Sequence, residues 1–161
     1  MATTYILTLN QLVRLFKTFS DDNLFLNDFG FGNTFDIGTS RQMLFPYMWV
    51  VPQPSTITNE NKTNIPSYNF SIIFADRIND EKNTTNSNGE NSTNGVEILS
   101  DMFQVAQDFV TYVSTLLKAY GVILDDNITI TPTMDATDDK VNGWVLDVVL
   151  KTKFSNCELP F

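Results

Sequence analysis

The segment from residue 96 to residue 120 constrains the fold more than any other part of the sequence. Its apolar residues recur every three to four positions, the repeat that predicts an α-helix. Asn94 followed by Glu97 is typical of a helix start, and Gly121 stands where a left-handed C-terminal cap is expected. About 23 residues rising 1.5 Å each give a helix roughly 35 Å long. Its apolar face is wide, so we expect the helix to pack on a sheet and to contact something else as well.

Alternating apolar and polar residues predict the sheet that this helix covers. Residues 68–77 alternate most clearly and place four large apolar side chains on one face, namely Tyr68, Phe70, Ile72 and Phe74. Residues 42–51 are rich in aromatic and β-branched residues and predict another strand, which Pro52 and Pro54 should close. Residues 55–66 are expected to form a polar loop between the two strands.

The remaining elements complete a single α+β domain over residues 1–161. Residues 8–19 predict a first helix, in which Thr8 and Gln11 fit a capping box. Residues 128–133 and 143–154 predict two further strands. The expected order is therefore α-β-β-α-β-β. Its simplest packing is a four-stranded, mainly antiparallel sheet with both helices on one face.

Two segments of unusual composition interrupt this domain. An aromatic loop at residues 23–40 alternates Asn, Asp and Gly with large rings, including Phe25, Phe29, Phe31 and Phe35. An irregular connection of this length is uncommon unless it covers something, either the domain's own core or a neighbouring subunit. Residues 79–94 have almost no apolar content and predict a flexible polar loop inserted within the domain.

Composition excludes several classes of function. The formal net charge of −9 argues against a protein that grips nucleic-acid phosphates and against docking on anionic lipid. The chain has no His, which removes the commonest general base and the commonest metal ligand. Its single cysteine, Cys157, cannot build a thiolate zinc site. No apolar run approaches the ~18 residues that would span a bilayer.

The acidic residues do not predict a catalytic or metal site. Four adjacent pairs occur, at residues 21–22, 80–81, 125–126 and 138–139, and all are expected in turns, where Asp is favoured for local hydrogen bonding. Asp135, Asp138 and Asp139 lack the spacing, central Gly and closing Glu of an EF-hand loop. The glycine-rich residues 29–33 match neither a P-loop nor a dinucleotide fingerprint. We therefore expect no enzyme, no catalytic residues, no cofactor and no bound metal.

Several motifs together resemble a known family. They are the strand at residues 70–77, the helix start at residues 97–103, and the turn Asp139-Lys-Val-Asn-Gly-Trp-Val145. From about residue 42 to the end, the pattern is similar to small neck and tail proteins of tailed bacteriophages, especially the tail-terminator-like ring subunits of crAss-like phages of gut Bacteroidetes. The Asp-x-Val-x-Gly-Trp turn carries most of the resemblance, and the aromatic loop has no counterpart in it.

The resemblance implies a structural virion protein, assembled in the host cytoplasm, that forms a homo-oligomeric ring of six-fold or twelve-fold symmetry. Its partners would be other neck or tail ring proteins, and genomic DNA would pass through the lumen without specific binding. Sheet edges and a wide helix face are natural assembly surfaces. An alternative is an adaptor that binds a different tail, baseplate or fibre protein. We expect the subunit contacts at Phe25, Phe29, Phe31, Phe35, Asn86, Asn88, Ile98, Val105 and Tyr112.

Overall fold

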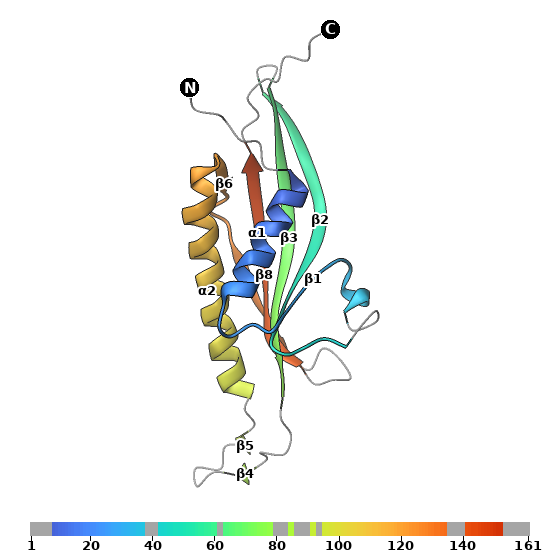
Figure 1. Cartoon of the computed structure of the whole chain (residues 1–161), viewed down its shortest axis with the longest axis vertical. Coiled ribbons are helices and arrows are strands. Elements are labelled where there is room, and N and C mark those ends of the chain that lie inside the picture. Colours follow the sequence, from blue (N-terminus) through green and yellow to red (C-terminus); the bar gives the residue numbers. More distant parts are fainter. Residues whose placement is uncertain are drawn as a thin grey trace.

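The computed structural model describes residues 8–37, 42–60, 63–78, 84–85, 91–92, 95–134 and 141–152. The helices in these ranges are α1 (Leu9–Asp22), the short 3-10 helix η1 (Thr34–Asp36) and α2 (Gly95–Ala119). The strands are β1 (Asp28–Phe31), β2 (Tyr47–Glu60), β3 (Thr63–Arg77), β4 (Thr84–Thr85), β5 (Asn91–Ser92), β6 (Val122–Leu124), β7 (Thr129–Met134) and β8 (Val141–Thr152). Figure 1 shows α1 and α2 lying along a tall, narrow sheet.

The α+β class is confirmed, but the expected four-stranded sheet is wrong. Within the described ranges the sheet has six strands in the order β1-β2-β3-β8-β6, with β7 also pairing with β8. It is mixed, because β1 runs parallel to β2 while the other pairs are antiparallel. The two strands of this sheet that the sequence missed, β1 and β6, are four and three residues long. The sequence also missed β4 and β5, which pair antiparallel as a separate two-stranded sheet within the loop expected at residues 79–94. Segments that short cannot show a recognisable alternation.

Strands β2 and β3 form a long hairpin, which corrects the expected loop at residues 55–66. Pro52 and Pro54 do not close β2, which continues to Glu60 with a register irregularity between Gln53 and Thr56. The reason lies in the hydrogen-bonding direction. The carbonyl of Val50 accepts from Gly32 N at 3.0 Å, so the even-numbered residues of β2 before the irregularity, up to Pro52, point their backbone groups away from β3. Pro52 therefore faces an edge beyond the end of β1, where its missing N–H breaks no ladder bond.

Both long helices begin and end close to their predicted bounds. In α1 the capping box between Thr8 and Gln11 is confirmed, with Thr8 N donating to Gln11 Oε1 at 2.8 Å. In α2 the C-terminal cap is confirmed as well, because Gly121 has a positive φ of 75°. The predicted N-cap, Asn94, lies outside the described residues.

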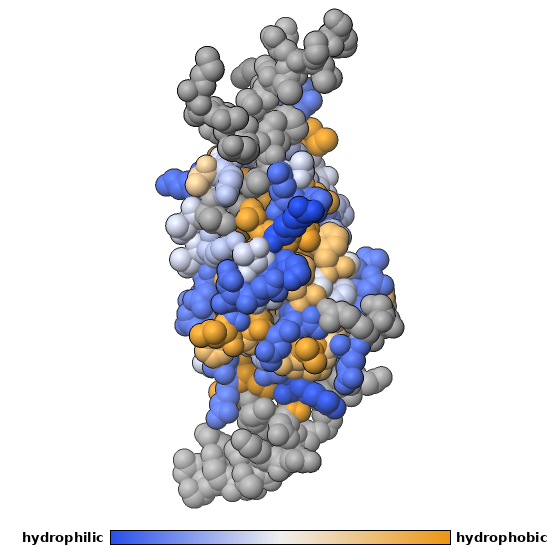
Figure 2. Space-filling model, viewed as in Figure 1, coloured by the Kyte–Doolittle hydropathy of each residue, from blue (hydrophilic) through white to orange (hydrophobic). Residues whose placement is uncertain are grey.

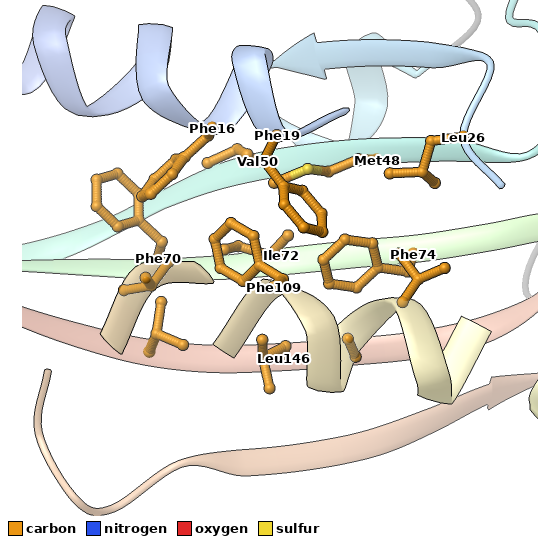
Figure 3. Close-up of a cluster of buried hydrophobic side chains, with 14 of the residues drawn as sticks. Phe16, Phe19, Leu26, Met48, Val50, Phe70, Ile72, Phe74, Phe109 and Leu146 are labelled. Atoms are coloured by element: carbon orange, nitrogen blue, oxygen red, sulfur yellow. The ribbon is translucent and has the colours of Figure 1, made fainter. Parts of the chain in front are cut away.

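The main core lies between these helices and one face of the sheet. Its largest fully buried side chains include Phe16 from α1, Phe70 and Phe74 from β3, and Phe109 from α2. The Phe109 ring contacts the rings of Phe16, Phe19 and Phe74 (Figure 3). This aromatic centre joins both helices to the sheet, so the fold is one packed unit.

A smaller cluster covers part of the opposite face of the sheet. Its members are Met43, Tyr47, Trp49, Val51, Ala75 and Val141. The Trp49 ring lies against β1, where a Cβ on Gly30 would come within 2.1 Å of it, and Trp49 Nε1 donates to Gly32 O at 3.1 Å. The glycines of the aromatic loop thus make room for an indole ring.

Candidate interaction surfaces

The acidic pairs that the structure describes do not converge on a chemical site. Asp21 and Asp22 are the last residues of α1, which corrects their expected place in a turn. Asp125 lies directly after β6, a strand that the sequence did not predict, and pairs with Lys151 at 3.0 Å. That hydrogen bond, helped by the backbone N–H of Asn127, lowers the pKa of Asp125. In the ranges covered by the structure, no three His, Cys, Asp or Glu residues group as metal ligands.

The structure does not describe the two other acidic pairs, at residues 80–81 and 138–139, or the calcium candidate at residues 135–139.

One described carboxyl has a pKa that burial shifts upward. Desolvation raises the pKa of the half-buried Asp76, and the nearby charge of Asp101 adds to that rise. Its Oδ1 accepts from Arg77 N at 2.7 Å. This arrangement lacks a nucleophile and an oxyanion donor and has no catalytic constellation.

The predicted contact residues on α2 belong mostly to the protein's own core. Ile98 and Val105 are buried, at 4% and 0% exposure, which corrects their assignment to a subunit interface. Tyr112 is half-buried and donates its hydroxyl to Leu15 O at 3.2 Å, so it joins α2 to α1. The wide apolar face of α2 is therefore covered by α1 at Tyr112 and belongs to the main core at Ile98 and Val105.

The aromatic-loop residues divide between core and surface. Phe29 packs against the main core, which supports the interpretation that part of this loop covers its own domain. Phe25, Phe31 and Phe35 are exposed, Phe35 at 86%. The predicted contacts Asn86 and Asn88 lie outside the described residues.

Sequence reasoning missed the most exposed apolar side chain of this region. Leu24, in the turn between α1 and β1, is 97% exposed, and Leu44 before β2 is exposed as well. Figure 2 shows orange apolar surface among blue polar surface over the lower half of the described body. The pair Leu24-Phe25 directly after Asp21-Asp22-Asn23 was the available signal, because large apolar residues beside turn formers are rarely buried by the turn itself.

The turn that carries Leu24 is held by hydrogen bonds. Phe25 N donates to Asn23 Oδ1 at 2.9 Å and Leu26 N donates to Asn23 O at 3.2 Å. Leu26 is buried in the main core, and Asn27 N donates to Pro46 O at 2.8 Å. The apolar pair is consequently presented on an anchored backbone.

A groove runs along the side of α2 that faces away from α1, between this helix and strands β6 and β7. One part, of about 300 Å³, is lined mainly by Phe103, Ala106, Val110, Ile128 and Ile130. A second part, of about 450 Å³, shares Val110 and Ile128 and continues to Lys118 and Asp126. The groove is apolar in its middle and charged at one end.

A separate hollow of about 430 Å³ lies on the sheet face that α1 and α2 leave uncovered. Phe35, Tyr47, Ile73, Thr133 and Val145 contribute to its lining. Farther along this face the side chains become polar, and Ser71 Oγ donates to Asp147 Oδ1. The apolar part is therefore limited to the end of the sheet near η1.

The sheet edges are less suited to pairing than their exposure suggests. At the β7 edge, Asp125 N donates to Val149 O at 3.0 Å, so odd-numbered residues of β8 point toward β6 and β7. Thr131 opposes Val145 and points back at β8, which leaves Pro132 facing outward. Pro52 on β2 and Pro132 on β7 thus each remove an outward N–H, a common protection of edge strands.

The described fold is an α+β protein whose mixed sheet has two helices on one face and exposed apolar side chains at the α1–β1 turn. No known family model matches the chain, and no curated protein matches its sequence. Among the helices that the structure describes, none is long and apolar enough to cross a membrane.

Proposed function

We propose that this chain is a structural subunit that assembles with copies of itself into a ring, of the kind found in the neck or tail of tailed bacteriophages. The observation that carries the proposal is the exposed apolar pair Leu24-Phe25 on its anchored turn. An apolar side chain held in water on a rigid backbone gains free energy when a partner covers it. The motif resemblance in residues 42–161 supplies the class of assembly.

The charge of the chain is compatible with a lumen through which DNA passes. With a formal net charge of −9, a ring would repel phosphate groups rather than retain them. The described surface contributes acidic side chains from several elements, including Asp21, Asp108, Asp126 and Asp147. We expect no measurable retention of duplex DNA at physiological salt.

The test is to measure the mass of the purified chain by mass photometry over a range of concentrations and to image the particles by electron microscopy. Closed rings of uniform copy number are expected, together with presence of the chain in purified virions. A chain absent from virions would contradict the virion role. Cross-links that join it mainly to a different protein, with few self-links, would favour the adaptor alternative.

A further inference from the structure

We propose that the contact between neighbouring copies is heterologous, with the Leu24-Phe25 turn of one copy seated in the α2–β6–β7 groove of the next. The proposal rests on the proposed self-assembly and names the two surfaces that make it. The occupant of the groove is a second copy of this chain.

The turn has the properties of an inserted element. Leu24 is 97% exposed and Phe25 is 50% exposed, while the neighbouring Leu26 is buried in the main core. Because Asn23 and Pro46 hold the turn by backbone hydrogen bonds, little conformational freedom is lost when it docks. Aromatic side chains that fill a pocket, the role of Phe25 in this contact, are typical centres of binding energy.

The groove has matching chemistry. Its middle is lined by Phe103, Val110, Ile128 and Ile130, all half-buried within the isolated chain. A volume of about 300 Å³ in this part accommodates an apolar side chain of the size of Leu or Phe. Ile128 and Ile130 remain half-exposed because the sheet edge ends at β7.

The two surfaces lie on opposite flanks, as a head-to-tail contact requires. The turn connects α1 to β1, which stands at one end of the strand order, whereas the groove borders β6 and β7 at the other end. On α2, Tyr112 contacts α1 while Val110, two residues earlier, faces the groove. Residues two positions apart on a helix point in nearly opposite directions. Repeating such a contact generates a closed ring or an open filament.

The dependence of association on salt concentration is an independent test of the contact. Each copy carries a formal charge of −9, although Asp21 at the turn pairs with Lys17 and Asp125 at the groove pairs with Lys151. Copies must therefore associate against repulsion, which salt screens over a Debye length of about 8–10 Å. Association of the wild-type chain should strengthen when salt is raised.

The experiment uses three full-length variants of equal charge. Leu24→Asp disables the turn, Thr111→Glu places a charge on the exposed rim of the groove, and Ile57→Asp is the control on the exposed β2 hairpin. Each substitution changes the formal charge from −9 to −10. A difference in association between the variants therefore does not come from their net charge. Circular dichroism and thermal melts verify that each variant folds. Sedimentation velocity at low and high salt reports association.

We expect Leu24→Asp and Thr111→Glu to weaken association at least about tenfold, whereas Ile57→Asp stays close to wild type. Mixing the first two variants leaves one intact contact per pair, between the turn of the Thr111→Glu chain and the groove of the Leu24→Asp chain. The mixture should therefore form dimers and no rings.

Two results would overturn the contact. If the wild type assembles and Leu24→Asp behaves like Ile57→Asp, self-assembly stands and this contact is wrong. If mixing the two defective variants gives no dimer, the turn does not enter the groove. A wild-type chain that stays monomeric at every salt concentration would instead remove the proposed function together with this contact.

Discussion

Truncating Phe109 tests whether the aromatic centre stabilises the fold as the structure implies. Its side chain is fully buried, and its ring lies 5.3 Å from Phe16, 5.2 Å from Phe19 and 5.8 Å from Phe74, measured between centroids. Replacing a buried Phe by Ala costs about 3–5 kcal/mol in the free energy of unfolding. Contacts with three neighbouring rings place Phe109→Ala near the upper end, because each favourable pair adds roughly 0.5–1.5 kcal/mol beyond its area.

The consequence is large against a total stability of about 5–15 kcal/mol. For a chain of this size each kcal/mol shifts the melting temperature by roughly 2–4 °C, so a decrease of about 10–20 °C is expected. The matched control is Phe35→Ala, the same chemical change at a side chain that is 86% exposed. There the expected change is within about 0.5 kcal/mol.

Urea unfolding followed by circular dichroism measures both variants at a concentration low enough to keep the chain monomeric. If the two free-energy losses agree within about 1 kcal/mol, the arrangement of α2 over the sheet is refuted. A large loss in Phe35→Ala alone would mean that the exposed ring is buried in a contact within the chain.

Three further changes test the sheet and its attachment to α2. Gly143→Ala should lower the free energy of unfolding by about 1–3 kcal/mol, because its Cβ would lie 2.0 Å from Phe74 O. A midpoint of urea unfolding equal to wild type would contradict that close approach. Trp144→Phe removes the 2.7 Å hydrogen bond from Nε1 to Leu99 O and should cost about 1 kcal/mol, while an unchanged midpoint would show the bond contributes nothing. Asp76→Asn should stabilise at pH 7 and have little effect at pH 3. Burial raises the folded-state pKa of this carboxyl above 3.8, so wild-type stability falls as pH rises past that value, and equal effects at both pH values would exclude this linkage.

The sequence predicted the long elements that are buried on one side. Helix α2 and the regular part of β3 have enough residues to reveal their periods, and the strand predicted at residues 143–154 is confirmed as β8. The elements it missed depend on distant partners. Strand β1 exists because β2 offers it a parallel edge, and the continuation of β2 past Pro52 depends on which neighbour its backbone faces. The local residue pattern shows neither the pairing of β1 with β2 nor the continuation of β2 past Pro52.

The candidate surfaces were predicted less well for a related reason. The sequence predicts a subunit contact on the wide apolar face of α2, but Ile98 and Val105 on this face belong to the main core together with residues of the sheet and α1. The side that stays partly open carries Phe103 and Val110, which have the same apolar character in sequence. Only the positions of α1 and β7 distinguish a covered apolar stripe from an uncovered one.

The distribution of open and protected surface restricts how copies of this chain can associate. Extending the sheet at either edge would place Pro52 or Pro132 opposite a strand whose carbonyl then lacks a donor, at a cost of about 1–3 kcal/mol for each buried unpaired group. Side-chain contacts carry no such cost, and Leu24 is 97% exposed in the part of the chain that the structure describes. A net charge of −9 opposes indiscriminate contacts between copies, so a contact that forms must bury apolar surface with good fit. Where Pro52 on β2 and Pro132 on β7 face outward, assembly by side-chain insertion is therefore favoured over assembly by continuous β-pairing.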